Sequence, residues 1–403
     1  MKDREHINSL DGLRTLAVFL VILRHWHLKY LNLEAGWIGV NLFFVLSGFL
    51  ITSILQRDKS LPLGKYLKNF YMKRSLRIFP IYYLYLLLCI IVLVSFFSFF
   101  GLQRFQSLQA ASGILRTNTW ALLTYTYNFH DLVSFFHGTT EAGSKFFGHL
   151  WSLGIEEQFY LFFPFIVYLL NKKALKYLMF LVIIVSPFLR AVAGYYLKSH
   201  GGDPFQAGLI IYKTTFFQLD ALAFGAVLGL TGWQNIKWSG KTLLLLFAAI
   251  VAFNLFTVYL LRNAGAAVSW SSLGFDLAAN QATYHTGIFL LDIKYAYTFT
   301  LLNILSLILL VFALRSNLFS AVLRLKPLTW IGKMSYGVYL YHNPFFEIFL
   351  LLLAGLGLNT QPADFISELI YFIAYIALVL FISYMSYRLI ETPFLKMKEK
   401  FNR

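Results

Sequence analysis

Charged residues are scarce in this sequence. Only 13% of its 403 residues are Asp, Glu, Lys or Arg, and 59% are apolar, whereas a soluble domain carries about 25% charged residues. The single cysteine, Cys89, excludes an internal disulfide and a cysteine-based metal site. The low count of 9 prolines, beside 42 phenylalanines, excludes a disordered or fibrous chain. The composition therefore predicts an integral membrane protein.

Long apolar runs account for this composition. A helix needs about 20 mostly apolar residues to cross the hydrocarbon layer. Five runs meet that length without a charge, at residues 35–55, 78–100, 242–261, 295–314 and 369–387. Five more contain polar groups, at residues 13–31, 150–170, 177–197, 214–230 and 329–353. The predicted fold is all-α, a polytopic bundle of about ten transmembrane helices that forms a single domain over residues 1–403.

The formal net charge of +16 indicates how these spans are oriented. Of the 34 Lys and Arg residues, 22 fall in segments on the side of the N-terminus and 8 on the opposite side. Because basic residues accumulate on the cytoplasmic side of membrane proteins, both chain ends are expected to be cytoplasmic. The excess charge then marks topology and contact with anionic lipids, and no nucleic-acid partner is needed to explain it.

The first expected span contains two unusual polar residues, Arg14 and His25. They are eleven residues apart, which places them on nearly the same helical face, roughly 16 Å apart along the axis. Ionisable groups inside a span are costly and often functional. In the alternative interpretation, Arg14 extends to lipid phosphates and His25 lies at the outer interface. Spacing alone does not choose between the two.

Two further spans carry polar strips. His149, Ser152, Glu156 and Tyr160 follow helical spacing and share one face of the span at 150–170. In the span at 329–353, Ser335, Tyr339 and His342 also share a face. We expect Ser152, Tyr160, Tyr339 and His342 to bind substrate, with Glu156 as a catalytic carboxylate. The alternative is an interhelical seam of hydrogen bonds.

Basic residues also cluster near the start of the third expected span, as Lys73, Arg74 and Arg77. Arg74 and Arg77 lie one turn apart, where both can grip phosphate. Anchoring at the cytoplasmic face is the alternative interpretation. Near the end of the last span, Arg388 and Glu391 are spaced to form a structural ion pair.

Six segments, taken in order, make the sequence similar to the acyltransferase-3 family of integral membrane acyltransferases. They are Arg-x10-His at residues 14–25, Phe-Phe-Val-Leu-Ser-Gly-Phe at 43–49, Arg-x-x-Arg at 74–77, Trp-Ser-Leu-x-x-Glu-x-Gln-Phe-Tyr at 151–160, Ser-Tyr-x-x-Tyr-Leu-x-His at 335–342 and Glu-x-Pro at 391–393. Each piece alone is weak evidence, but six in the family's order are specific. The chain resembles the standalone type, without a fused hydrolase-like domain.

The resemblance implies an O-acyltransferase of the bacterial inner membrane. Such proteins take an acyl group, usually acetyl, from cytoplasmic acyl-coenzyme A and pass it to a hydroxyl of a lipid-linked glycan or polysaccharide. Lys73, Arg74 and Arg77 would bind the anionic donor, with Arg14 deeper in the bundle, and no metal is implied. His25 would be the general base, with Glu156 fixing its tautomer.

One position departs from the family pattern. Members often carry an arginine two residues before the aspartate of the sixth span, where this chain has Gln218 before Asp220. The charge partner of Asp220 is therefore not evident from the sequence. A glycolipid transporter or flippase is the rival function, since intramembrane Arg, His and Glu also build proton-coupled pathways.

Overall fold

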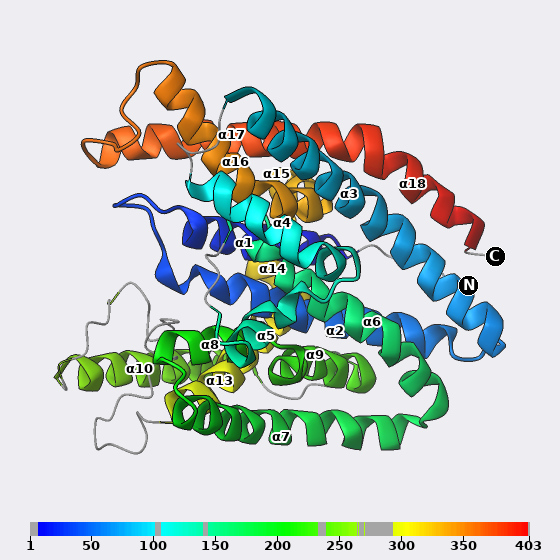
Figure 1. Cartoon of the computed structure of the whole chain (residues 1–403). Coiled ribbons are helices and arrows are strands. Elements are labelled where there is room, and N and C mark those ends of the chain that lie inside the picture. The colour runs from blue at the N-terminus through cyan, green and yellow to red at the C-terminus, as the bar shows by residue number, and fades with distance from the viewer. Residues whose placement is uncertain are drawn as a thin grey trace. The chain divides into compact units, whose positions relative to one another are not determined.

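The computed structural model describes residues 7–100, 106–139, 144–232, 239–263, 265, 270 and 293–401. All regular elements in these ranges are helical, as the apolar runs predict (Figure 1). In lipid, a helix satisfies its backbone hydrogen bonds internally, which favours it over an open strand. Seven of the described helices are long and apolar enough to cross a membrane. The all-α, multi-pass membrane fold is thereby confirmed.

The chain forms two compact units, and each is named after one of its helices. The α7 unit contains the described residues of Met1–Arg24, Asn32–Arg57 and Leu169–Ser335. The α3 unit contains His25–Leu31 and the described residues of Asp58–Tyr168 and Tyr336–Arg403. Helix α1, Asn8–His25, contributes its last residue, His25, to the α3 unit.

The α7 unit is built around α7, Lys172–Ser199, which contacts α9, Leu219–Thr231, and α13, Lys294–Arg315 (Figure 1). Its other helices are α1 up to Arg24, α2, Ile38–Asp58, α8, Pro204–Lys213, α10, Gly240–Asn263, α14, Asn317–Leu323, and α15, Lys326–Lys333.

Glycines bring α2 and α9 into close contact. A Cβ atom added at Gly48 would come within 2.0 Å of the Leu222 carbonyl oxygen, and one at Gly225 within 1.9 Å of the Val45 carbonyl oxygen. Small residues therefore let the two backbones touch, as the Gly-rich second span predicts.

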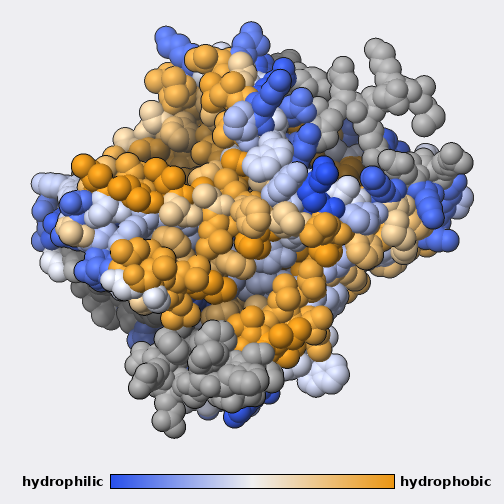
Figure 2. Space-filling model, turned by 90° about the horizontal axis from the view of Figure 1, so that it is seen from above, coloured by the Kyte–Doolittle hydropathy of each residue, from blue (hydrophilic) through white to orange (hydrophobic). Residues whose placement is uncertain are grey.

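Helix α7 presents large apolar side chains at its surface. Tyr177, Ile184, Phe188 and Tyr195 are each at least 65% exposed and recur at about helical spacing. Figure 2 shows hydrophobic residues over broad areas of the face that it draws. Such surface is expected to face lipid in a membrane protein, because water would leave it unfavourably hydrated.

The α3 unit comprises α3, Leu63–Phe100, α4, Gln106–Leu123, α5, His130–Phe136, α6, Trp151–Leu169, α16, Ser335–Gly355, α17, Phe365–Ser386, and α18, Thr392–Met397. Helix α3 contacts α4 and α18. A π-helical turn, Tyr387–Glu391, joins α17 to α18.

Several predicted boundaries were wrong. Helix α3 begins at Leu63, 15 residues before the predicted start at Ile78, so Arg74 and Arg77 lie within a helix rather than before it. The span predicted at 329–353 is broken at Met334 into α15 and α16. The span predicted at 214–230 begins with a 3₁₀ turn, Thr215–Phe217, and becomes α-helical only at Leu219.

The predicted pair of Arg388 and Glu391 does not form. In the π-helical turn, the backbone hydrogen bonds join residues five apart instead of four apart. Residues three apart, such as Arg388 and Glu391, then no longer share one face of the helix. Arg388 lies over the Tyr384 ring, and Glu391 is buried. The total of ten spans and the cytoplasmic placement of both ends stay predictions.

Candidate active site

Two histidines from distant segments meet in the α3 unit. His25 Nδ1 lies 3.1 Å from His342 Nε2 on α16, and the two ring centroids are 5.0 Å apart. His342 is fully buried. The first and the fifth family motifs are therefore in direct contact through their histidines.

Hydrogen bonds define the protonation of this pair. His342 Nδ1 lies 2.5 Å from the Tyr339 carbonyl oxygen, which only accepts, so His342 Nδ1 carries the proton. In a neutral imidazole the other nitrogen accepts, so His25 Nδ1–H donates to His342 Nε2. The lone pair of neutral His25 is then on Nε2. This is the protonation state that a general base requires.

A third imidazole, His149, lies beside His342, with ring centroids 5.2 Å apart. Its Nε2 lies 3.0 Å from the Leu340 carbonyl oxygen. That carbonyl is available because Pro344, four residues on, has no N–H to complete the helical bond. His149 Nδ1 is buried and has no hydrogen-bond partner among the described residues. The three imidazoles do not form a metal site: no group of three or more metal-ligating side chains occurs in the described part of the chain.

The predicted substrate-binding residues Ser152 and Tyr339 contact each other. Ser152 Oγ and Tyr339 Oη are 2.6 Å apart, and both hydroxyls lie near the His149 carbonyl oxygen, at 3.3 and 2.9 Å. Both side chains are buried. These bonds join α6 to α16 and support the histidine cluster, so the role of these residues in binding substrate stays a prediction.

Arg74 connects the basic segment to the motif on α6. Its guanidinium lies over the Tyr160 ring, 5.0 Å from the centroid, and Tyr160 Oη donates to Glu156 Oε2 at 2.8 Å. Tyr160 thus positions Glu156, and His342, rather than the predicted Glu156, is the group that bonds to His25 Nδ1. Lys73, Arg74 and Arg77 are all partly exposed on α3, and their binding of the donor stays a prediction.

Arg14, on α1 in the α7 unit, is paired with a residue of its own helix. Its Nη1 lies 2.5 Å from Asp11 Oδ1, and Asp11 is buried. The ion pair at i, i+3 holds the guanidinium within the helix that carries it. A role for Arg14 in donor binding stays a prediction.

Tyr125 was not predicted from the sequence. It is the one non-glycine residue with positive φ among those described, at 58°. Its ring stacks on Tyr82, with centroids 4.2 Å apart, and its carbonyl oxygen accepts from Gln158 Nε2 at 2.9 Å. A side chain at Gly154 would come within 2.7 Å of the same oxygen. The motif at 151–160 therefore also fixes a strained turn, and strain of this kind is concentrated at functional sites.

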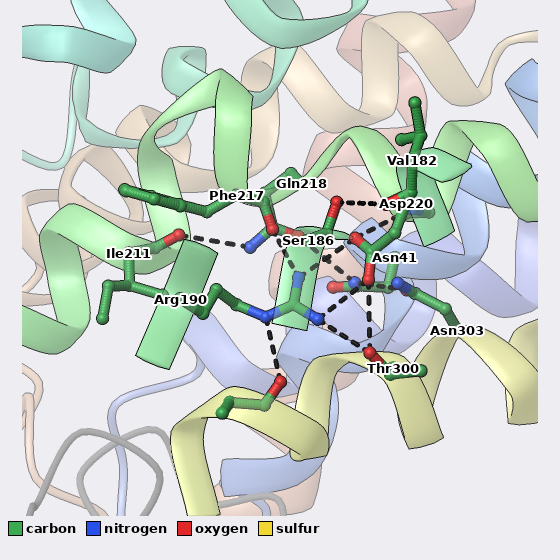
Figure 3. A network of polar contacts seen from close by, with 12 residues as sticks. Asn41, Val182, Ser186, Arg190, Ile211, Phe217, Gln218, Asp220, Thr300 and Asn303 are labelled. Atoms are coloured by element: carbon green, nitrogen blue, oxygen red, sulfur yellow. Dashed lines mark hydrogen bonds and ion pairs between the residues drawn. The ribbon is translucent and has the colours of Figure 1, made fainter. Parts of the chain in front are cut away.

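The partner of Asp220 in the α7 unit was also missed. Arg190 on α7 donates to both Asp220 carboxylate oxygens, at 3.1 and 2.9 Å, and both residues are fully buried (Figure 3). Further bonds from Arg190 reach Thr300 and the carbonyl oxygens of Phe217 and Ala296. An arginine from another helix thus supplies the charge that position 218 lacks.

Sequence comparison defines the class of protein to which this site belongs. The acyltransferase-3 model, described as an acyltransferase domain, matches residues 7–388. The chain belongs to the acyltransferase-3 family.

Individual relatives are more distant. The chain is 29% identical over 405 residues to the peptidoglycan O-acetyltransferase OatA of Listeria monocytogenes, covering 98% of this chain and 56% of that protein. It is 27% identical over 404 residues to the O-acetyltransferase OatA of Staphylococcus aureus, covering 98% of this chain and 58% of that protein. The chain therefore spans less than two thirds of these relatives. No solved structure matches it significantly.

Proposed function

We propose that the protein is a membrane O-acetyltransferase of the bacterial inner membrane. It takes an acetyl group from cytoplasmic acetyl-coenzyme A and transfers it to a hydroxyl of a cell-surface carbohydrate, such as peptidoglycan, lipopolysaccharide or a lipid-linked glycan. The contact between His25 and His342 is the observation that carries this proposal, because it leaves His25 Nε2 as an unprotonated base. Membership of the acyltransferase family supports it.

His25 acts as the general base. Its Nε2 takes the proton of the acceptor hydroxyl while that oxygen attacks the thioester carbonyl carbon. The carbon–sulfur bond then breaks, and the leaving thiolate takes the proton from the His25 imidazolium. His342 orients the ring and stabilises the imidazolium through His25 Nδ1–H, as the third member of a triad does.

The basic side chains Lys73, Arg74 and Arg77 bind the phosphates of coenzyme A. The Arg74 guanidinium lies over the Tyr160 ring, which Glu156 holds in turn, so Arg74 loses little conformational freedom on binding and is favoured as the principal contact. Glu156 acts through Tyr160 to fix this geometry.

Labelled acetyl-coenzyme A tests the function against its rival, a glycolipid transporter. The purified protein is reconstituted in vesicles with bacterial glycan acceptors and acetyl-labelled donor. An acetyltransferase forms a labelled ester on the glycan that mild base removes. A transporter moves the acceptor across the bilayer without labelling it, and that outcome would overturn the proposal.

A further inference from the structure

The segment that follows His25 is held by a buried carboxylate from α17. Glu368 is fully buried, and its Oε1 accepts from Trp26 Nε1 at 2.9 Å and from the Leu31 backbone N–H at 2.8 Å. The Tyr30 backbone N–H lies 3.0 Å from Oε1 and 2.8 Å from Oε2. Three N–H donors therefore converge on one carboxylate, an arrangement that stabilises a buried negative charge.

The same helix also holds the partner of His25. Tyr375, about two turns after Glu368 on the same helix, donates its hydroxyl to the His342 carbonyl oxygen at 2.6 Å. The Trp26 ring is fully buried and packs on Tyr375 and Phe346, with centroid distances of 5.3 Å to each. One rigid element thus contacts the residue next to His25 and the backbone of His342.

We propose that Glu368 is a positioning residue for the acetyl-transfer reaction: it fixes the segment from Trp26 to Leu31 so that His25 stays within hydrogen-bond distance of His342. The inference rests on the proposed function. His25 is the last residue of α1, where helical hydrogen bonding ends, so its orientation depends on what holds the following segment. Glu368 acts through Trp26 and does not touch the reacting atoms.

Glu368→Gln is the direct test. An amide has one acceptor oxygen, and its NH₂ group would oppose the N–H donors that now converge on the carboxylate. Turnover with acetyl-coenzyme A should fall about 10- to 100-fold, because displacement of a catalytic group by about 1 Å has effects of this size. The KM for acetyl-coenzyme A should stay within about twofold, since the expected donor site lies on α3.

Asp364→Asn is the matched control on the same helix. Asp364 is exposed and caps α17 through the Ser367 backbone N–H, a bond that lowers the pKa of its carboxyl. Asparagine caps a helix equally well, so turnover and KM should equal those of the unmodified protein. Trp26→Phe provides a second test that keeps an aromatic ring and removes one hydrogen bond, and turnover should fall about fivefold.

Hydrogen exchange tests, independently of activity, whether Glu368 holds the segment from Trp26 to Leu31. In Glu368→Gln, the peptide containing Tyr30 and Leu31 should exchange about tenfold faster than in Asp364→Asn, because the amide weakens the hydrogen bonds that now protect the backbone N–H groups of both residues. Unchanged exchange would show that Glu368 does not fix this segment. Faster exchange with unmodified turnover in both Glu368→Gln and Trp26→Phe would overturn the positioning role. Absence of transfer by the unmodified protein would instead overturn the proposed function.

Discussion

The two units each bury a polar cluster, and the clusters differ in how completely their atoms are bonded. In the α7 unit, Arg190 directs all its nitrogens at acceptors, and both Asp220 oxygens receive hydrogen bonds (Figure 3). In the α3 unit, His149 Nδ1 is buried without a hydrogen-bond partner among the described residues. Beside it, the bond from His25 to His342 fixes the proton of neutral His25 on Nδ1.

This difference suits the cluster in the α7 unit to stabilising the fold and the cluster in the α3 unit to catalysis. A fully bonded buried ion pair has no free acceptor to offer a substrate, and breaking it leaves an uncompensated charge. A histidine cluster tied to backbone carbonyls has fixed tautomers and an unprotonated nitrogen, which is what proton transfer needs. We therefore expect substitutions in the first cluster to change how much protein folds, and those in the second to change how fast it turns over.

Arg190→Ala should have the largest effect on stability. Removing one partner of a buried pair costs about 3–5 kcal/mol, so folded protein should be nearly lost from membranes. The double variant Arg190→Met with Asp220→Leu should recover much of the yield, because apolar residues of similar size often replace such pairs. Yield and thermal unfolding in detergent measure this. Well-folded but inactive Arg190→Ala protein would contradict the comparison.

His342→Phe should leave the yield near that of the unmodified protein and lower turnover roughly 100-fold, because His25 loses the group that orients it. Phenylalanine keeps the ring volume, so little packing is lost. Turnover is measured with labelled acetyl-coenzyme A on purified, monodisperse protein. Turnover equal to that of the unmodified protein would show that His342 only fills space.

Tyr339→Phe should have the smallest effect. It removes a hydroxyl that bonds to Ser152 and to the His149 backbone, at a cost of about 1 kcal/mol in the free energy of unfolding. The control is Tyr341→Phe, on the same helix as Tyr339, which removes a hydroxyl that bonds to Ser386 on α17. A higher KM for the glycan in Tyr339→Phe alone would support the predicted substrate-binding role, and equal KM values would leave it structural.

The helix positions were largely predictable because each depends on local apolar content. The errors arose where polar residues continue a helix, as α3 does from Leu63, or where a long apolar run is interrupted, as at Met334. His25 and His342 were each identified by motif and spacing, but their contact joins residues 317 apart and has no local signal. Arg190 and Glu368 stand singly in apolar surroundings, and only the fold reveals their partners.

The most direct measurement of the central claim is acetyl transfer by His25→Ala. The variant is purified, shown to bind coenzyme A like the unmodified protein, and assayed with labelled donor and glycan acceptor. Loss of a general base predicts turnover about 100- to 10,000-fold lower, with donor affinity retained. Transfer at the rate of the unmodified protein would contradict the account.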